Sequence, residues 1–224
     1  MPAKGTSPFA TFLIIGPTCF FLGILFALFP YDYHVLWSTP TATAAFGHAA
    51  DPTLAPADLY FLLQENHLKF LHASPPLISR ILHIVIGTGL LGFIMKLYKP
   101  SEANMLFDGA SLALYMCGIT VYIANIVKGL RTVTDDAYLG GVAPEATSAA
   151  GDGEYDYIGR EDSLKVLAAS NTILALVLCG VLILQAGQWY AQRKEAEEIE
   201  EMDKVRDEKK KAAKEGGAHG KKKQ

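Results

Sequence analysis

The stretch FATFLIIGPTCFFLGILFALF, residues 9–29, decides the fold class of this chain. It contains no charged residue, and a helix of about 20 apolar residues crosses the hydrocarbon core of a bilayer. Three further apolar stretches follow, at residues 77–97, 106–127 and 164–186, and none of the four carries a charge near its middle. We therefore predict an all-α membrane protein with four transmembrane helices.

The composition supports this class and excludes another. Half of the 224 residues are hydrophobic, and the formal net charge of −3 is too balanced to indicate a nucleic-acid partner. Cys19, Cys117 and Cys179 each fall inside an apolar stretch. We interpret them as small packing residues in the membrane rather than as a disulfide framework.

The first loop contains a candidate amphipathic helix, from Pro56 to about His72. At helical spacing one face is apolar and the polar residues lie elsewhere; the apolar set is Leu59, Leu62, Leu63 and Phe70, and the polar set is Gln64, Glu65 and Lys69. The segment is too short and too polar to span a bilayer. We expect it to lie at the membrane surface.

The hydrophilic end of the chain forms a second unit. Residues 1–190 read as a four-span membrane domain, and residues 191–224 as a charged, partly helical C-terminal tail. Alternating charges favour a helix to about Lys214, with Gly216-Gly217 as its stop. Ser101 is a plausible N-cap for the third span. Four spans place both termini on one side, and the lysine distribution favours the cytosol.

Small residues recur at helix-packing spacing. Gly87, Gly89 and Gly92 match the G-x-G-x-x-G pattern of dinucleotide sites, but no strand precedes them, so we interpret them as a close-packing helix face. Gly23 and Ala27 have the small-xxx-small spacing of such faces. These faces either hold the bundle together or receive helices of a client protein, and the sequence leaves both open.

Polar residues near the span ends are candidates for hydrogen bonds between helices. Asn125 lies near the end of the third span, and Asn171 lies in the fourth beside Ser170 and Thr172. His83 has no Asp, Glu or Cys cluster beside it. We predict no catalytic residue, no metal ligand and no cofactor site, and hence no enzyme. Since charge at bilayer depth typically marks an ion path, its absence also argues against a pump.

The chain ends Lys221-Lys222-Lys223-Gln224. Lys221 and Lys222 match the dilysine signal that retrieves membrane proteins to the endoplasmic reticulum (ER) when it lies on a cytosolic tail. An arbitrary end to a lysine-rich tail gives the same residues, and we keep both readings.

Several runs of this sequence resemble the fungal secretory-component family. They are FLIIGPT at residues 12–18, FPYDY at 29–33, LYKPSEAN at 97–104, NIVKGLRT at 125–132 and GREDSLK at 159–165, with Gln188-Trp189-Tyr190 after the fourth span. The resemblance covers nearly the whole chain, except the middle of the 128–163 loop and the far tail. Members of this family are ER membrane packaging chaperones for amino-acid permeases.

The resemblance implies a multi-pass protein of the ER membrane with four spans and both termini cytosolic. It implies amino-acid permeases as clients, which the membrane domain shields from aggregation, and vesicle-coat components as partners of the tail. It carries over no catalytic residue. Two alternatives from other classes are a small oligomeric membrane carrier or channel and a tetraspan scaffold. The carrier needs intramembrane charges or broken helices, and the scaffold class usually has a disulfide-rich loop.

Overall fold

The computed structural model describes residues 8–37, 56–98, 102–135 and 159–220. These residues are helical apart from short turns. The elements are α1 (Pro8–Leu36), α2 (Pro56–His72), α3 (Pro76–Leu97), α4 (Glu102–Val121), a π-helix η1 (Tyr122–Val127), α5 (Lys128–Thr134) and α6 (Arg160–Gly220). Ser101, the predicted N-cap, lies outside the described residues.

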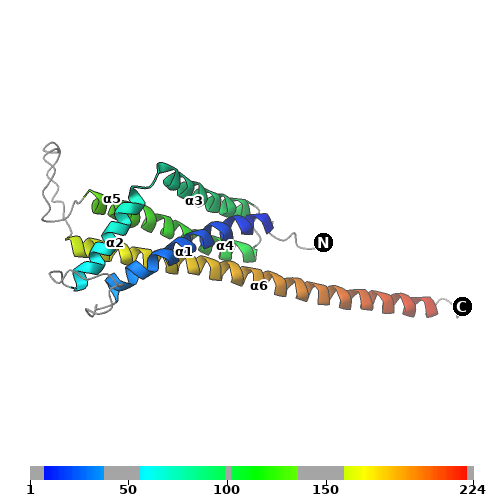
Figure 1. The fold of residues 1–224 in the computed structure, drawn as a ribbon. Helices are drawn as coiled ribbons and strands as arrows, with labels where there is room; N and C mark the ends of the chain where they lie inside the picture. The colour runs from blue at the N-terminus through cyan, green and yellow to red at the C-terminus, as the bar shows by residue number, and fades with distance from the viewer. Residues whose placement is uncertain (1–7, 38–55, 99–101, 136–158, 221–224) are drawn as a thin grey trace, which may run out of the picture.

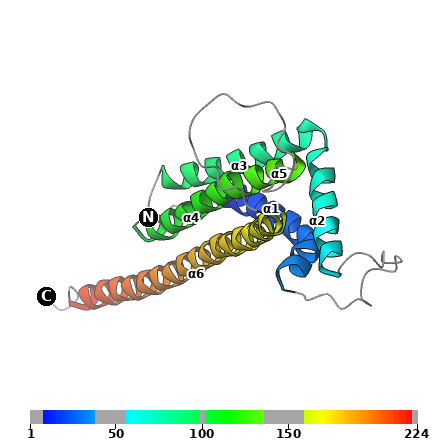
Figure 2. The same cartoon turned by 90° about the vertical axis from the view of Figure 1, so that its left-hand side faces the viewer.

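The prediction of an all-α protein with four spans is confirmed. Four helical stretches are long and apolar enough to cross a membrane: Phe9–Leu36, Pro76–Leu97, Met105–Thr134 and Arg160–Lys211. Figure 1 shows them side by side in one bundle, with α2 across one end and α6 projecting beyond the other. Figure 2 shows α2 at a steep angle to the bundle axis. The helix α1 begins at the end from which α6 projects, as an even number of spans requires.

The first span is longer than predicted, because α1 continues through Pro30 to Leu36. Aromatic side chains stack along the added turns, with ring centroids 5.9 Å apart for Phe29 and Tyr33 and 6.0 Å apart for Tyr33 and Trp37. Val35 is also buried against other helices at this end. These contacts sustain the helix beyond a proline that the sequence alone marks as its boundary.

The third span also exceeds its predicted end at Val127. It runs without a break from α4 through η1 into α5 and ends at Thr134. A π-helix is rare and is often found at functional sites. Gly129 lies against α6 here, where an added Cβ would lie 3.1 Å from Leu167 Cδ1. The widened turn therefore sits between two well-packed segments of the same span.

The fourth span and the tail form one continuous helix. α6 begins at Arg160, with Glu161 and Asp162 in its first turn, where acidic groups favour the helix dipole. It leaves the bundle and continues to Gly220, so the predicted stop at Gly216-Gly217 is wrong. Because α6 stays helical beyond the bundle, the tail is a straight rod. From Tyr190 to Gly220 this rod is about 45 Å long at 1.5 Å per residue.

The predicted helix of the first loop is confirmed as α2. The face that packs on the protein differs from the predicted apolar face of Leu59, Leu62, Leu63 and Phe70. Its buried residues are Tyr60, Phe61, Gln64, Glu65 and Leu68. Leu62, Leu63 and Phe70 are exposed, Phe70 by 72%. The face of α2 that packs on the protein is thus mixed, with Tyr60, Phe61 and Leu68 beside Gln64 and Glu65, while part of the predicted apolar face is exposed.

The core of the bundle is closed by residues from α1, α3, α4 and α6. Ile14, Phe93, Tyr115 and Val181 are among its most buried side chains. Glycines let the helices approach closely. A Cβ added at Gly118 would lie 3.2 Å from Leu174, and one added at Gly180 would lie 3.1 Å from Leu114. The sequence reading had singled out neither glycine.

Candidate functional site

A buried polar cluster joins α3, α4 and α6 at the end of the bundle from which the tail projects. The Lys96 Nζ atom lies 3.0 Å from Asp108 Oδ1 and donates to Gln185 Oε1 at 2.6 Å and to Gln188 Oε1 at 2.7 Å. We call Lys96, Asp108, Ser111, Gln185 and Gln188 the exit cluster. Every one of these residues is at most 5% exposed.

The exit cluster is closed by its own hydrogen bonds. Gln188 Nε2 donates to Asp108 Oδ2 at 2.7 Å, and Gln185 Nε2 donates to Ser111 Oγ at 3.1 Å. The lysine and the carboxylate neutralise one another, so the buried charge is compensated. Gln185 and Gln188 bring α6 into this network. The cluster therefore fixes the place where α6 leaves the bundle.

The absence of charge near the middle of each span does not exclude a buried charged pair nearer the ends, and the exit cluster contains one. Lys96 and Asp108 lie within one or two turns of the ends of their spans. Their 12-residue separation across a tight connector is the signal that could have suggested a pair. Since the cluster is fully hydrogen bonded, it has the character of a clamp rather than of an ion path.

A second polar cluster joins α1, α2 and α6 at the opposite end. Gln64 Nε2 donates to Asp32 Oδ1 at 2.9 Å, and Asn171 Nδ2 donates to Asp32 Oδ2 at 3.0 Å. We call these three residues the Asp32 cluster. All three are at most 4% exposed, and the side-chain oxygens of Gln64 and Asn171 have no hydrogen-bond partner. Within the described residues no cation pairs with Asp32.

An ion pair beside the Asp32 cluster fastens α2 to the start of α6. Arg160 Nη2 lies 2.6 Å from Glu65 Oε2, and Lys69 Nζ lies 2.9 Å from Glu65 Oε1. The His67 ring stacks on Tyr31 with centroids 4.2 Å apart. Burial lowers the pKa of His67 below its ordinary value, so the ring is neutral at neutral pH.

The predicted small-residue positions divide into two groups. Gly89 and Gly92 pack inward: a Cβ at Gly89 would overlap the Tyr115 hydroxyl, and one at Gly92 would lie 2.9 Å from Ile14 Cγ1. Gly23 and Gly87 have nothing within 4 Å of an added Cβ, and Ala27 is also exposed. The first group holds the bundle together, and the second faces whatever surrounds it.

The predicted polar residues also differ in their roles. Asn171 bonds to another helix, as expected, whereas the Ser170 and Thr172 hydroxyls donate to carbonyls of their own helix, those of Val166 and Ala168. His83 likewise contacts the Ser79 carbonyl oxygen on its own helix at 2.6 Å. Asn125 lies in η1 with its side chain exposed. Lys221 and Lys222 lie outside the described residues.

These features define a four-span helical membrane protein with two buried polar clusters and with polar and small residues on its outer surface. The sequence profile of the SHR3 chaperone family, described as ER membrane protein SH3, matches residues 5–224. The secretory component protein psh3 of Schizosaccharomyces pombe is 24% identical over 207 residues, which are 89% of this chain and 81% of that protein. No solved structure matches the chain.

The chain belongs to the SHR3 chaperone family. It is a multi-pass ER membrane chaperone of the secretory pathway, as the resemblance of its sequence runs predicted. The family is one of chaperones and not of enzymes.

Proposed function

We propose that this protein assists the folding of polytopic amino-acid permeases and their packaging into coated transport vesicles. In this proposal residues 1–190 form the client-binding membrane domain and residues 191–224 the cytosolic tail that recruits vesicle-coat components. Both termini are cytosolic, and Lys221 and Lys222 return the chaperone to the ER.

The observation that carries the client-binding role is the exposed Asn125 carboxamide within the third span. A polar group that faces hydrocarbon without a partner costs about 2–7 kcal/mol. An unfinished permease presents polar groups on helices that have not yet packed. Contact between the two sets satisfies both until the permease packs its own helices, after which the client leaves.

Small residues on other helices extend this outer surface. Three small residues are exposed: Gly23 and Ala27 on α1, and Gly87 on α3. No atom lies within 4 Å of a Cβ added at either glycine. A client helix can approach the backbone closely at such positions, because association in lipid relies on van der Waals contact and polar bonds. These positions are therefore our candidate client contacts, together with Asn125.

The test compares the candidate client-contact positions with another exposed position, in cells that lack the native gene. G23F and N125L should leave the bundle intact, but permeases should aggregate in the ER, as seen on native gels. C179F adds bulk at another exposed position and serves as a matched control, which should support permeases fully. If the permeases fold and reach the cell surface with G23F and N125L, or with no chaperone at all, the proposal is wrong.

A further inference from the structure

The Asp32 cluster has a buried negative charge and two buried acceptors without donors. The carboxylate accepts from the amide nitrogens of Gln64 and Asn171, while the side-chain oxygens of the same two amides have no hydrogen-bond partner. All three residues are more than nine-tenths buried. Buried polar groups in folded proteins are nearly always hydrogen bonded. The group that would complete this cluster is therefore one that donates N–H bonds and carries positive charge.

The cations that pair at this end of the bundle pair with other carboxylates. Arg160 and Lys69 contact Glu65, at 2.6 and 2.9 Å. Lys165 contacts Glu161 on its own helix at 2.5 Å. Among the residues that the structure describes, no ion pair joins a lysine or an arginine to the carboxylate of the Asp32 cluster.

The stretches of sequence between the helices at this end contain no such cation either. Residues 38–55 lie between α1 and α2, and residues 136–158 lie between α5 and α6. Together these two stretches contain six acidic residues and no lysine or arginine. Their negative charge attracts cations to this end of the molecule. A positive side chain for Asp32 therefore has to come from another molecule.

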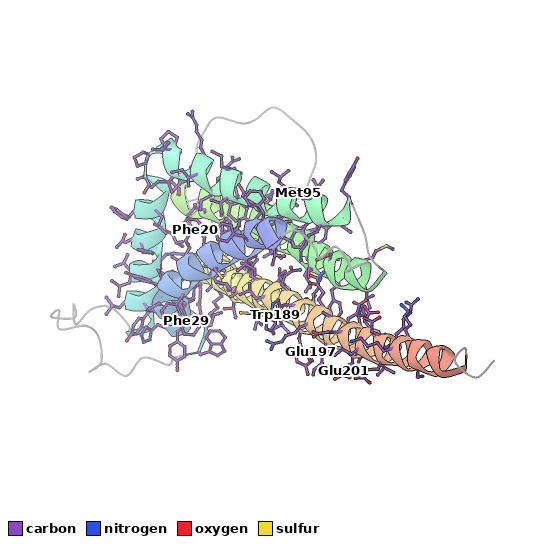
Figure 3. The ribbon with its side chains drawn as sticks, turned by 90° about the vertical axis from the view of Figure 1, so that its right-hand side faces the viewer. Phe20, Phe29, Met95, Trp189, Glu197 and Glu201 are labelled. Carbon is purple, nitrogen blue, oxygen red and sulfur yellow. The ribbon has the colours of Figure 1, made fainter. Side chains whose placement is uncertain are left out.

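The Asp32 cluster lies close to the end of the first span. Asp32 is four residues, or about 6 Å, before Leu36, the last residue of α1. Figure 3 shows Phe29, about one turn earlier, at the end of the bundle that α2 crosses and away from Glu197 and Glu201 on the projecting rod. A lysine near the end of a transmembrane helix lays its apolar stem along the hydrocarbon and holds its ammonium group at this depth.

We propose that the Asp32 cluster receives the ammonium group of a lysine from a client transmembrane helix. An ammonium group has three N–H donors and no acceptor, so it can donate to the oxygens of Gln64 and Asn171. The two amide nitrogens keep their bonds to Asp32, whose charge then has a counter-charge beside it. This inference rests on the proposed binding of clients, and it names one chemical group of the client that the chaperone recognises.

Entry to the Asp32 cluster requires α2 to move, because the cluster is buried and Gln64 belongs to α2. This helix crosses the end of the bundle at a steep angle (Figure 2) and is joined to α3 by the short turn at residues 73–75. The ion pair of Arg160 and Glu65 ties it to α6, and the arginine side chain is 38% exposed. Release of this pair lets α2 tilt away and opens Asp32 to the bilayer boundary.

The experiment measures binding of synthetic transmembrane segments of an amino-acid permease to the full-length chain in nanodiscs. One set consists of segments with a lysine near one end, and the matched set has norleucine in place of that lysine. The wild-type chain should bind the lysine segments about tenfold or more tightly. Asp32→Asn should abolish this preference without weakening the binding of the norleucine segments, and its unfolding transition should match that of the wild type.

The matched control is Asp162→Asn. It removes the same charge from an exposed position in the first turn of α6, at the same end of the bundle. This variant should keep the preference for the lysine segments. Loss of the preference in both variants would show a general effect of charge at this end and overturn the assignment to the Asp32 cluster.

A second measurement tests entry through α2. Arg160→Met should raise the association rate of the lysine segments about fivefold, because loss of a partly exposed ion pair makes the open position of α2 more accessible. Lys165→Met removes an equal charge from the same helix without releasing α2 and should leave the rate unchanged. An unchanged rate in Arg160→Met would overturn the role of α2 in entry.

The outcomes separate this inference from the function on which it rests. If no permease segment binds the wild-type chain, the proposed binding of clients is itself wrong. If the segments bind but lysine and norleucine segments bind equally, or if Asp32→Asn keeps the preference, client binding stands and the Asp32 cluster is not a lysine receptor. Without any segment, NaCl might be compared with N-methylglucamine chloride: stabilisation by sodium in the wild type and not in Asp32→Asn would assign the cluster to an inorganic cation and overturn the proposal.

Discussion

The two ends of the bundle are held by polar clusters of opposite design. In the exit cluster a buried lysine faces a buried carboxylate, and two glutamines complete the network. In the Asp32 cluster a buried carboxylate faces only two amides, whose oxygens lack partners. On α6, Asn171 and Gln185 are 14 residues, or about 21 Å, apart. The hydrogen bonds of the exit cluster are all made, whereas the Asp32 cluster has two acceptor oxygens without a partner.

The largest effect should come from removing the carboxylate of the exit cluster. Asp108→Leu leaves Lys96 buried without a counter-charge, which should cost about 3–5 kcal/mol of unfolding free energy. The measurement is reversible unfolding in mixed micelles with increasing denaturing detergent. The paired variant K96M/D108L removes both charges and should recover most of the loss. A double variant as unstable as Asp108→Leu would contradict a compensating pair.

Close packing one turn before Lys96 should matter next. Gly92→Val places a branched side chain where Ile14 Cγ1 and the Ala10 carbonyl oxygen already lie within 3.0 Å of an added Cβ. Overpacking of this kind costs about 1–3 kcal/mol and forces α1 away from α3. The matched control is Gly87→Val on the same helix, with nothing within 4 Å. Equal losses for both variants would remove the distinction between inward and outward glycines.

The sequence predicted the class of fold because lipid leaves few choices. A backbone in hydrocarbon must satisfy its own hydrogen bonds, so four long apolar stretches mean four helices. Apolar content does not determine where a helix ends once it leaves the lipid. Leu36, Thr134 and Gly220 lie beyond the predicted ends. Aromatic side chains stack at the end of α1, the third span continues through a π-helix, and ion pairs support the projecting part of α6 as far as Lys210.

The candidate sites were less accessible to sequence reasoning. Spacing identifies small residues that share a face but not the direction of that face, so Gly92 and Gly87 received the same interpretation. The polar clusters depend on contacts between residues as distant as Asp32 and Asn171, which are 139 positions apart. Only the three-dimensional packing of α1 against α6 brings these two residues together.

At the α2 end, loss of an ion pair should have a smaller effect. Arg160→Met removes one partner of Glu65, but Lys69 still pairs with it and the Arg160 side chain is 38% exposed, so about 1 kcal/mol should be lost. Hydrogen exchange should rise in α2 and remain unchanged in α3. Lys165→Met, whose ammonium pairs with Glu161 on its own helix, is the control and should leave α2 protected.

The smallest effect should come from neutralising the second cluster, and it tests the comparison most directly. In Asp32→Asn the new carbonyl oxygen accepts from one amide, and the new amide group can donate to an unpartnered oxygen of Gln64 or Asn171. Stability should therefore change by less than about 1 kcal/mol, because a lost charge-assisted bond is offset by a new one. Asp108→Asn, the same chemical change at the other end, removes the counter-charge of Lys96 and should cost several-fold more. Equal losses at the two positions, measured under identical unfolding conditions, would mean that the Asp32 charge is itself compensated. The two ends would then share one design, with a cation close to Asp32.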